Sequence, residues 1–407
     1  KGVSCVLPAL LDHHGPVAVL DIKGELFAMT KRAREQLGRT VIVLNPFDVV
    51  EKNQWCWNPL DYIRRDEFER DSQAIIEGLL EPPTQYNQHF YKIASDILQV
   101  SLEVIQHTLP KEAFTLNTLY DFVCGPGFVN RLKAWETQRN FLQGRPAKMA
   151  HILLIAGEEE RGSFLTTLKR NLSWIGFEKN KAFLTSQNDS LNSFSFEDLL
   201  DNKIDVFCVI PLDMIESMSG FLRLFTNIVL GTVIRQSGYK NPQEKILLLL
   251  DEFPRLGAMR QLINIVTVAA GAGIEAFMVA QDKSSIESVW GKETDLIFGS
   301  SSTVRIFNIG RTDTVTASWA SSLMGDKTVI TRSNATREYV DFLKGAGSES
   351  VTQMKEKLMT ASEIQELSQS KMLCFLRGQK PLLLERIISH KHPFYKGRLD
   401  PNPTLLR

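Results

Sequence analysis

Apolar and polar residues follow two different rhythms along this chain. Short apolar runs alternate with segments of helical spacing in the first 65 residues and again after about residue 205. A continuous apolar run is typical of a strand that is buried on both faces of a parallel sheet. Strands that alternate with helices predict a doubly wound α/β domain. The runs that we expect to be strands are 17–22, 40–44, 205–211, 246–250, 275–280 and 303–309.

We expect an exposed helix over 31–37, a helix over 221–234 that is apolar nearly all round, and a further helix near 261–269. After residue 330 the chain is polar and weakly patterned, apart from two strands, 372–376 and 382–388, that face each other across residues 377–381 as a hairpin would.

Between residues 66 and 176 the pattern is helical only. Ile93, Ile97, Val100 and Val104 recur at helical spacing. Further helices are expected over 115–123, 129–142 and 161–174, without a convincing strand among them. We therefore predict an all-α domain over residues 66–176, inserted into an α/β domain that is formed by residues 1–65 and 177–407. The charged faces of the inserted helices suit either a solvated surface or a surface that binds a partner.

Two adjacent carboxylates, Asp251 and Glu252, follow the apolar run Ile246–Leu250. The carboxyl ends of the strands line the crevice in which open α/β sheets bind ligands. In nucleotide hydrolases an acid at this place holds Mg²⁺, and a neighbouring glutamate polarises the attacking water. The same pattern also fits a core strand that is followed by a solvated acidic turn.

The chain opens with Lys1 and Gly2, followed by the apolar segment Val3–Leu11. If glycine-rich residues preceded Lys1, it would be the phosphate-binding lysine of a P-loop, and the helix after it would present its N-terminus to the phosphates. Gly2 stands where that motif has the Ser or Thr that binds Mg²⁺. The Lys-Gly pair carries little information by itself.

Two polar residues follow later predicted strands. Gln281 comes after the strand at 275–280, where it suits a sensor of the γ-phosphate or a residue that orients water, or else a cap of the next helix. Arg311 comes just before a helix that Thr312 or Asp313 would cap. It suits an arginine finger that reaches a neighbouring subunit, or else a partner of a carboxylate.

Composition limits the function classes. The 47 basic residues balance the 47 acidic ones, which argues against a protein coated in basic surface but allows a basic groove. The five cysteines are scattered without a C-x-x-C pair, so we expect reduced thiols and no zinc site. The longest apolar runs fall short of the roughly 20 residues that span a bilayer.

An ordered series of motifs resembles the cytosolic ATPase domain of type IV secretion coupling proteins, the TraG/TraD-type conjugative DNA-transfer ATPases. The matching pieces are KGVSCVLPALL, PVAVLDIKGELFAMTKRAREQLG, VIVLNPF, WNPLDYI, FSFEDLL, LLLLDEFPRLGAM, AQD and IGRTD. Each piece is weak alone, but their order is specific. The resemblance implies an α/β, RecA-like P-loop NTPase domain with a mainly parallel twisted sheet, plus an inserted all-α domain.

The resemblance also implies a set of residues that act on ATP and Mg²⁺. These are Lys1 and Gly2 at the phosphates, Asp251 at Mg²⁺, Glu252 as the catalytic base, Gln281 as the phosphate sensor and Arg311 as the trans-acting arginine. Lys-Gly is frequent in this family, so Gly2 fits the family although it departs from the general P-loop.

The resemblance also implies an assembly, a location and partners, which are those of a motor that transfers DNA. Members form a homo-hexamer on the cytoplasmic face of the bacterial inner membrane, held by an N-terminal segment that we expect to lie outside this chain. They pass relaxase-bound single-stranded DNA, effector proteins or both to the secretion-channel proteins. We expect the isolated chain to be mostly monomeric. The alternative function is a recruitment platform of the same system with weak or absent ATP hydrolysis.

Overall fold

The structure is a computed structural model that describes residues 2–83, 87–186, 188–236, 244–259, 262–263, 273–334 and 349–402. Contacts between residues divide the chain into two compact units. The first unit comprises residues 1–280 and 387–407, and the second comprises residues 281–386. The predicted domain boundaries at residues 65 and 177 fall elsewhere, inside the first unit, and stay a prediction.

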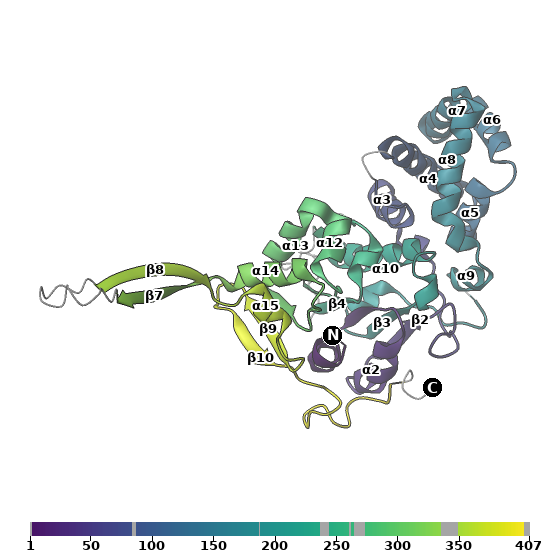
Figure 1. The fold of residues 1–407 in the computed structure, drawn as a ribbon. Helices are drawn as coiled ribbons and strands as arrows, with labels where there is room; N and C mark the ends of the chain where they lie inside the picture. The colour runs from purple at the N-terminus through teal and green to yellow at the C-terminus, as the bar shows by residue number, and fades with distance from the viewer. Residues whose placement is uncertain are drawn as a thin grey trace, which may run out of the picture. The chain divides into compact units, whose positions relative to one another are not determined.

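A five-stranded parallel sheet forms the centre of the first unit (Figure 1). Its strand order is β2-β3-β1-β4-β5, so the strand that precedes Asp251 lies next to β1 and β5. β1, β3 and β4 are buried along their whole length, as their continuous apolar runs predicted. The strands are β1 (Val17–Asp21), β2 (Thr40–Leu44), β3 (Ile204–Val209), β4 (Ile246–Leu250) and β5 (Ile274–Met278).

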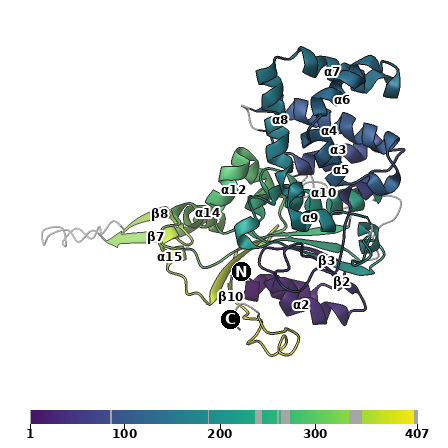
Figure 2. The same cartoon turned by 90° about the vertical axis from the view of Figure 1, so that its right-hand side faces the viewer.

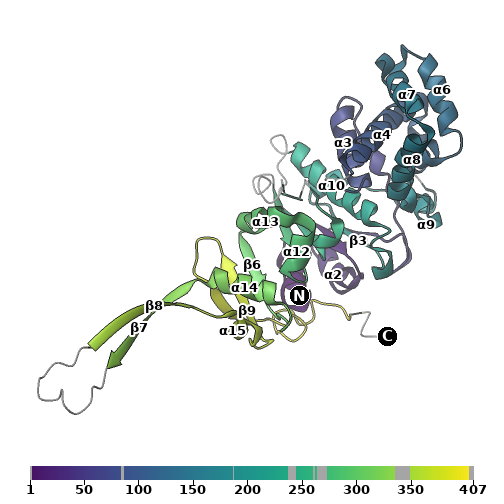
Figure 3. The ribbon, with the colours of Figure 1, turned by 45° about the horizontal axis from the view of Figure 1, so that its top comes forward.

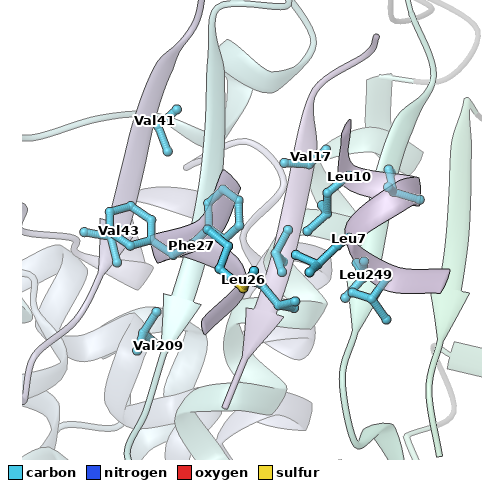
Figure 4. Packing of buried hydrophobic residues seen from close by; sticks show 14 of the residues in the cluster. Leu7, Leu10, Val17, Leu26, Phe27, Val41, Val43, Val209 and Leu249 are labelled. Carbon is cyan, nitrogen blue, oxygen red and sulfur yellow. The ribbon is translucent and has the colours of Figure 1, made fainter. Parts of the chain in front are cut away.

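Helices near the start of the chain cover one face of this sheet. A π-helical turn, η1 (Gly2–Val6), continues into α1 (Leu7–Asp12), and α2 (Glu25–Glu35) follows β1. Figure 4 shows their apolar side chains against those of the strands. The cluster includes Leu7, Leu10, Leu26 and Phe27 from the helices and Val17, Val41, Val43, Val209 and Leu249 from the strands.

The helix α10 (Ser219–Gln236) lies on the opposite face of the sheet (Figures 1 and 2). It is buried on nearly all sides, as its almost wholly apolar sequence predicted. Aromatic rings surround it: the ring of Phe221 lies 5.8 Å from that of Trp57 and 5.7 Å from that of Trp174, between centroids. Because α10 also packs against the first helix of the helical segment, it joins that segment to the sheet.

Within the described residues of the predicted helical segment, 66–176, helices occur and strands do not, and one more helix, α9, follows it (Figure 2). The predicted helix over 129–142 is shorter than expected: α6 ends at Thr137, and Leu142 and Gln143 adopt left-handed backbone angles within the turn that follows. The helices are α3 (Phe68–Leu79), α4 (Gln88–Thr108), α5 (Leu116–Cys124), α6 (Phe128–Thr137), α7 (Arg145–Ile155), α8 (Glu158–Leu172) and α9 (Glu178–Phe183).

The helix predicted over 31–37 corresponds to the last part of α2, but it is only partly exposed. α2 begins earlier, at Glu25, and the Arg34 side chain is completely buried. The guanidinium of Arg34 donates to the carboxylate of Asp205 in β3, with 2.7 Å between Nε and Oδ2. A charged residue on a helix is normally a sign of exposure, and its partner lies 171 positions away, beyond the reach of a local pattern.

The second unit is smaller and holds a three-stranded antiparallel sheet in the order β10-β9-β6. The hairpin predicted around residues 377–381 is confirmed, although its second strand ends at Glu385 rather than residue 388. The elements are α12 (Lys283–Trp290), α13 (Thr294–Ser300), β6 (Thr303–Ile306), α14 (Thr314–Met324), α15 (Ala361–Gln365), β9 (Lys371–Leu376) and β10 (Leu382–Glu385).

A two-stranded antiparallel ribbon, formed by β7 (Asp326–Asn334) and β8 (Glu349–Lys357), extends from the second unit (Figure 3). The sequence predicted only polar, weakly patterned chain here. The ribbon escaped prediction because none of its side chains with a described exposure is buried: Ile330 and Met354 are 57% and 58% exposed. Strand patterns are recognisable when one face packs on a core, and this ribbon lacks that signal.

The last described segment, residues 387–402, returns to the first unit and contacts its first helix. The N–H of Ser389 donates to the Val3 carbonyl over 2.9 Å, and the Tyr395 hydroxyl donates to Asp12 Oδ2 over 2.6 Å. Pro8 lacks an N–H and leaves carbonyl groups of the preceding turn without a helical donor, so the contact from Ser389 satisfies one of them. This segment therefore supports the helix that follows Lys1.

The helix predicted over 261–269 lies outside the described residues, apart from Leu262 and Ile263. Within the part of the chain that the structure describes, no helix has the length and apolarity to cross a membrane.

Candidate functional site

The acidic pair lies at the carboxyl end of β4, as predicted. The N–H of Asp251 donates to the Leu20 carbonyl of β1 over 3.3 Å, and both acidic residues are half-buried. Glu252 adopts φ 55° and ψ 42°, the left-handed region that residues other than glycine seldom occupy. Such backbone strain concentrates at functional sites, where the surrounding structure holds it in place. The geometry therefore favours a functional pair over a plain solvated turn.

The residues after Glu252 anchor this conformation. They form the 3₁₀ turn η8 (Phe253–Leu256), in which Phe253 is 3% exposed and Leu256 is wholly buried. The N–H of Phe253 donates to the Val279 carbonyl, next to β5, over 3.1 Å. Gly257 closes the turn at φ 78°, an angle suited to glycine. The carboxylates are thus held between the ends of β1 and β5.

Asp21, at the end of β1, is a third acidic residue at this edge. Leu20 pairs with Leu250 in the parallel register, so Asp21 lies beside Asp251. Its side chain is 1% exposed and accepts the Phe27 N–H over 2.8 Å. Burial raises the pKa of the Asp21 carboxyl to about 7, and the charge of Asp251 adds to this rise, whereas the Phe27 N–H opposes it. The sequence prediction did not include Asp21, although it too ends an apolar run.

The helix formed by η1 and α1 points its N-terminus toward the same edge. α1 ends at Asp12, and the chain reaches the amino end of β1 at Val17 a few residues later, so the helix runs antiparallel to the strands. Figure 4 shows Leu10 near Val17 and Leu7 near Leu249, which agrees with this direction. Gly2 is therefore placed toward the carboxyl ends of the strands, whereas Lys1 lies outside the described residues.

Gln281 and Arg311 belong to the second unit, whereas Asp251 and Glu252 belong to the first. Gln281 is exposed and does not cap the next helix; Asp282 does so, because its Oδ1 accepts the Ser285 N–H over 2.7 Å. The alternative of a capping glutamine is therefore wrong. Asp313 caps α14 through the Thr316 N–H, as predicted. The Arg311 side chain is 84% exposed, and its Nη2 lies 4.0 Å from Glu366 Oε1.

The donor set at the edge of the sheet suits Mg²⁺ that is shared with phosphates. Within the described residues, no group of three or more His, Cys, Asp or Glu side chains is arranged to hold a metal ion. Mg²⁺ is usually bound by one or two carboxylates together with phosphates and water, rather than by a cage of protein ligands. Asp251 can supply such a carboxylate.

The chain is similar to proteins of conjugative DNA transfer. Protein VirD4 of Rhizobium rhizogenes is 26% identical over 396 residues, a match that covers 95% of this chain and 56% of that protein. This chain therefore spans little more than half the length of that relative.

Solved structures show the same fold. The conjugative coupling protein TrwBdeltaN70, in an unbound form, superimposes with a TM-score of 0.72 at 18% identity, covering 95% of this chain and 82% of that one. The plasmid coupling protein TrwB in complex with ADP and Mg²⁺ gives 0.65 at 18% identity, over 93% and 81%. These likenesses confirm the predicted fold, a RecA-like domain with a mainly parallel sheet and an inserted all-α region.

The family model described as "Type IV secretory system Conjugative DNA transfer" matches residues 1–405. The motif series predicted this family, and the match confirms it. This chain belongs to the Type IV secretory system Conjugative DNA transfer family.

Proposed function

We propose that this chain is the motor part of a type IV secretion coupling protein, which hydrolyses ATP to move substrates into a secretion channel. The observation that carries the proposal is the Asp251–Glu252 pair at the end of a central strand, with Glu252 held in a left-handed conformation. A hydrolase needs a carboxylate fixed beside the attacking water, and a strained, anchored glutamate fits that need.

In this proposal each residue has one role at the nucleotide. Glu252 orients the attacking water and accepts its proton. Lys1 contacts the phosphates, and the helix that begins at Gly2 presents its free N–H groups to them. Asp251 holds Mg²⁺, which when bound neutralises charge on the phosphates. The TrwB complex with ADP and Mg²⁺ supports this choice of ligands.

Two residues of the second unit complete the proposal. Gln281, in the short segment between β5 and α12, senses the γ-phosphate. Arg311 acts on the nucleotide of a neighbouring subunit; its 84% exposed side chain and distant carboxylate partner leave it available to another chain. A trans-acting arginine would make hydrolysis depend on assembly, and we propose a homo-hexamer as the active form. The isolated chain would then be mostly monomeric and slow.

The cargo and the location are proposed on the basis of the family. We propose that the full-length protein sits on the cytoplasmic face of the inner membrane, anchored by a segment outside this chain. It receives relaxase-bound single-stranded DNA, effector proteins or both, and delivers them to the secretion-channel proteins. The family description and the VirD4 relative support this role. The division into an all-α domain over 66–176 and a nucleotide-binding domain over 1–65 and 177–407 belongs to the same proposal.

A second candidate is a recruitment platform that hydrolyses ATP weakly or not at all. The helical segment favours it, because Ile152 and Ile155 of α7 are 47% and 70% exposed and could contact cargo. Replacing Glu252 with Gln separates the two functions. A motor would lose substrate transfer while it still docks cargo, whereas a platform would keep transfer nearly unchanged.

The experiment that tests the proposal is ATP hydrolysis by the full-length protein in detergent, with and without single-stranded DNA. Lys1→Ala and Glu252→Gln are each expected to lower the turnover rate by 100-fold or more, on the order of the effect of removing a catalytic group. Turnover that rises with DNA indicates nucleic acid cargo, and turnover indifferent to DNA indicates protein cargo. Absence of turnover in a folded protein would contradict the motor and leave the platform.

A further inference from the structure

Two turns at the carboxyl edge of the central sheet are built alike, one after β1 and one after β4. Each begins with an acidic residue at the end of its strand, Asp21 or Asp251. Each then presents one exposed basic side chain, Lys23 or Arg255, between residues that are buried or half-buried. Because β1 and β4 are neighbours in the sheet, roughly 5 Å apart, the two basic residues lie along the same edge.

The turn after β1 holds Lys23 on a fixed backbone. Asp21 accepts backbone N–H groups from this turn, among them those of Phe27 and Lys23 itself. Gly24, with φ 72°, packs so closely that a Cβ there would lie 2.0 Å from Val50 Cγ1. The Lys23 side chain is nevertheless exposed, and no described residue forms an ion pair or hydrogen bond with its ammonium group.

The turn after β4 holds Arg255 in the same way. Phe253, Pro254 and Leu256 of η8 are buried, so Arg255 is the one exposed side chain of that turn. Its N–H donates to the Glu252 carbonyl over 3.0 Å. Among the described residues, none pairs with the Arg255 guanidinium. A rigid turn thus links Arg255, whose guanidinium has no partner in the described part of the chain, directly to the left-handed glutamate.

The informative feature is that neither Lys23 nor Arg255 has a partner for its charged group within the ranges that the structure describes. Three carboxyl groups, those of Asp21, Asp251 and Glu252, occur at this edge. A long basic side chain that served only solubility would be free to form an ion pair with one of these carboxyl groups. Phosphate is the anion that suits this arrangement: a guanidinium binds two of its oxygens, and a neighbouring ammonium supports a second contact. A phosphate here would also bring negative charge close to the turn that carries Glu252.

We propose that Lys23 and Arg255 form a two-cation phosphate site at the β1–β4 edge, and that Arg255 transmits phosphate contact to Glu252 through their shared turn. The inference rests on the proposed motor function and extends it with two residues that the motif analysis did not assign. The phosphate belongs either to the bound nucleotide or to the backbone of single-stranded nucleic acid. Arg255 is a positioning residue in this proposal, because it acts on hydrolysis through Glu252.

The test uses the full-length protein and the variants Lys23→Ala, Arg255→Ala and Arg255→Lys. Lys245→Ala is the matched control: Lys245 precedes the same strand at its opposite end, is exposed and is paired with Glu275 over 2.9 Å. ATP hydrolysis is measured against ATP concentration and against the concentration of a single-stranded oligonucleotide. Thermal unfolding midpoints close to that of the unchanged protein establish that the exposed substitutions leave the fold intact.

If the phosphate is that of nucleic acid, Lys23→Ala and Arg255→Ala raise the oligonucleotide concentration for half-maximal stimulation about 5- to 10-fold, at unchanged KM for ATP. If it is that of the nucleotide, the KM for ATP rises by a similar factor and stimulation is unchanged. In either case Arg255→Lys shows a smaller change than Arg255→Ala, since lysine keeps the charge but loses the bidentate contact. Variants that behave like Lys245→Ala in both titrations would overturn the proposal.

A binding measurement separates this site from the motor function. Fluorescence anisotropy of a labelled oligonucleotide, and of a labelled ATP analogue, requires no hydrolysis. Each lost phosphate contact lowers the salt dependence of oligonucleotide binding by about one unit of slope. If the unchanged protein hydrolyses no ATP but Arg255→Ala still weakens binding of either probe, the motor function fails and the phosphate site stands. If no variant weakens binding of either probe, the phosphate site fails.

Discussion

Arg34 of α2 and Asp205 of β3 form a wholly buried ion pair at the amino end of the central sheet, with 2.7 Å between Nε and Oδ2. Arg34 also donates to the Gly15 carbonyl over 2.6 Å, and Asp205 accepts the Val17 N–H over 2.9 Å. The pair therefore ties the turn that enters β1 to its neighbouring elements. It stabilises the end of the sheet that lies opposite the acidic edge.

Breaking this pair should destabilise the first unit strongly. Asp205→Ala leaves the Arg34 guanidinium charged and buried without its carboxylate, so the free energy of unfolding should fall by about 3–5 kcal/mol. Lys203→Ala is the matched control, because its pairs with Asp198 and Asp201 are exposed and should be worth less than about 1 kcal/mol. Urea unfolding followed by tryptophan fluorescence measures both. Equal losses in the two variants would contradict a stabilising role for burial at this pair.

His13 should make stability depend on pH. Its Nε2 lies 2.8 Å from the Lys245 carbonyl oxygen, and burial lowers the pKa of His13 below 6.5, with the charge of Arg34 acting in the same direction. Just below pH 6.5 the unfolded chain binds a proton that the folded chain does not. The free energy of unfolding should therefore fall as the pH drops through 6.5, and level off below the pKa of the folded state.

His13→Gln should reduce that fall. Urea midpoints at pH 7.5, 6.5 and 5.5 should differ less in the variant than in the unchanged protein. His14→Gln is the neighbouring control, since His14 is exposed. If both variants kept the full pH dependence, other groups would be responsible for it.

Gly24 should tolerate a side chain less well than Gly38. Both have a left-handed backbone, with φ of 72° and 82°, which costs an L-residue about 1–2 kcal/mol. At Gly38 a Cβ would meet nothing within 4 Å, whereas at Gly24 it would meet Val50 Cγ1 at 2.0 Å. Overpacking of this kind adds about 1–3 kcal/mol.

Gly24→Ala should therefore lower the unfolding midpoint more than Gly38→Ala. Adding Val50→Ala to Gly24→Ala should recover part of the loss, because it removes the overlapping methyl group. An additive, further loss in the double variant would show that the Val50 contact is not the cause.

The sequence predicted the central sheet well because burial on both faces leaves an unambiguous apolar run, as in β4. It predicted Asp251 and Glu252 because the carboxylates directly follow that run. It missed the burial of Arg34 because the partner, Asp205, is distant in the chain. Asp21 and Arg255 gave weaker signals. Asp21 is a single acid at a strand end, and Arg255 is a single base in a turn. They become informative only when the strand register places the turns after β1 and β4 side by side.

Glu252 offers a test of strain that is independent of catalysis. At an ordinary position glycine is less stable than alanine by about 0.5–1 kcal/mol, because the unfolded chain gains freedom. At φ 55° the order should reverse, since alanine pays the cost of a left-handed backbone and glycine does not. We expect Glu252→Gly to be more stable than Glu252→Ala by about 1 kcal/mol in urea unfolding. Both variants lack the carboxylate, so the comparison isolates the backbone.

The matched pair is Glu275→Gly and Glu275→Ala at the second residue of β5, where the backbone is extended. There the usual order should hold, with glycine the less stable variant. If glycine were also the less stable variant at Glu252, its backbone would not be strained, and the case for a functional conformation would rest on position alone. If glycine is the more stable variant at Glu252 and the less stable one at Glu275, the backbone at Glu252 lowers the stability of the fold. Such a cost is expected where the position of a residue matters to the chemistry.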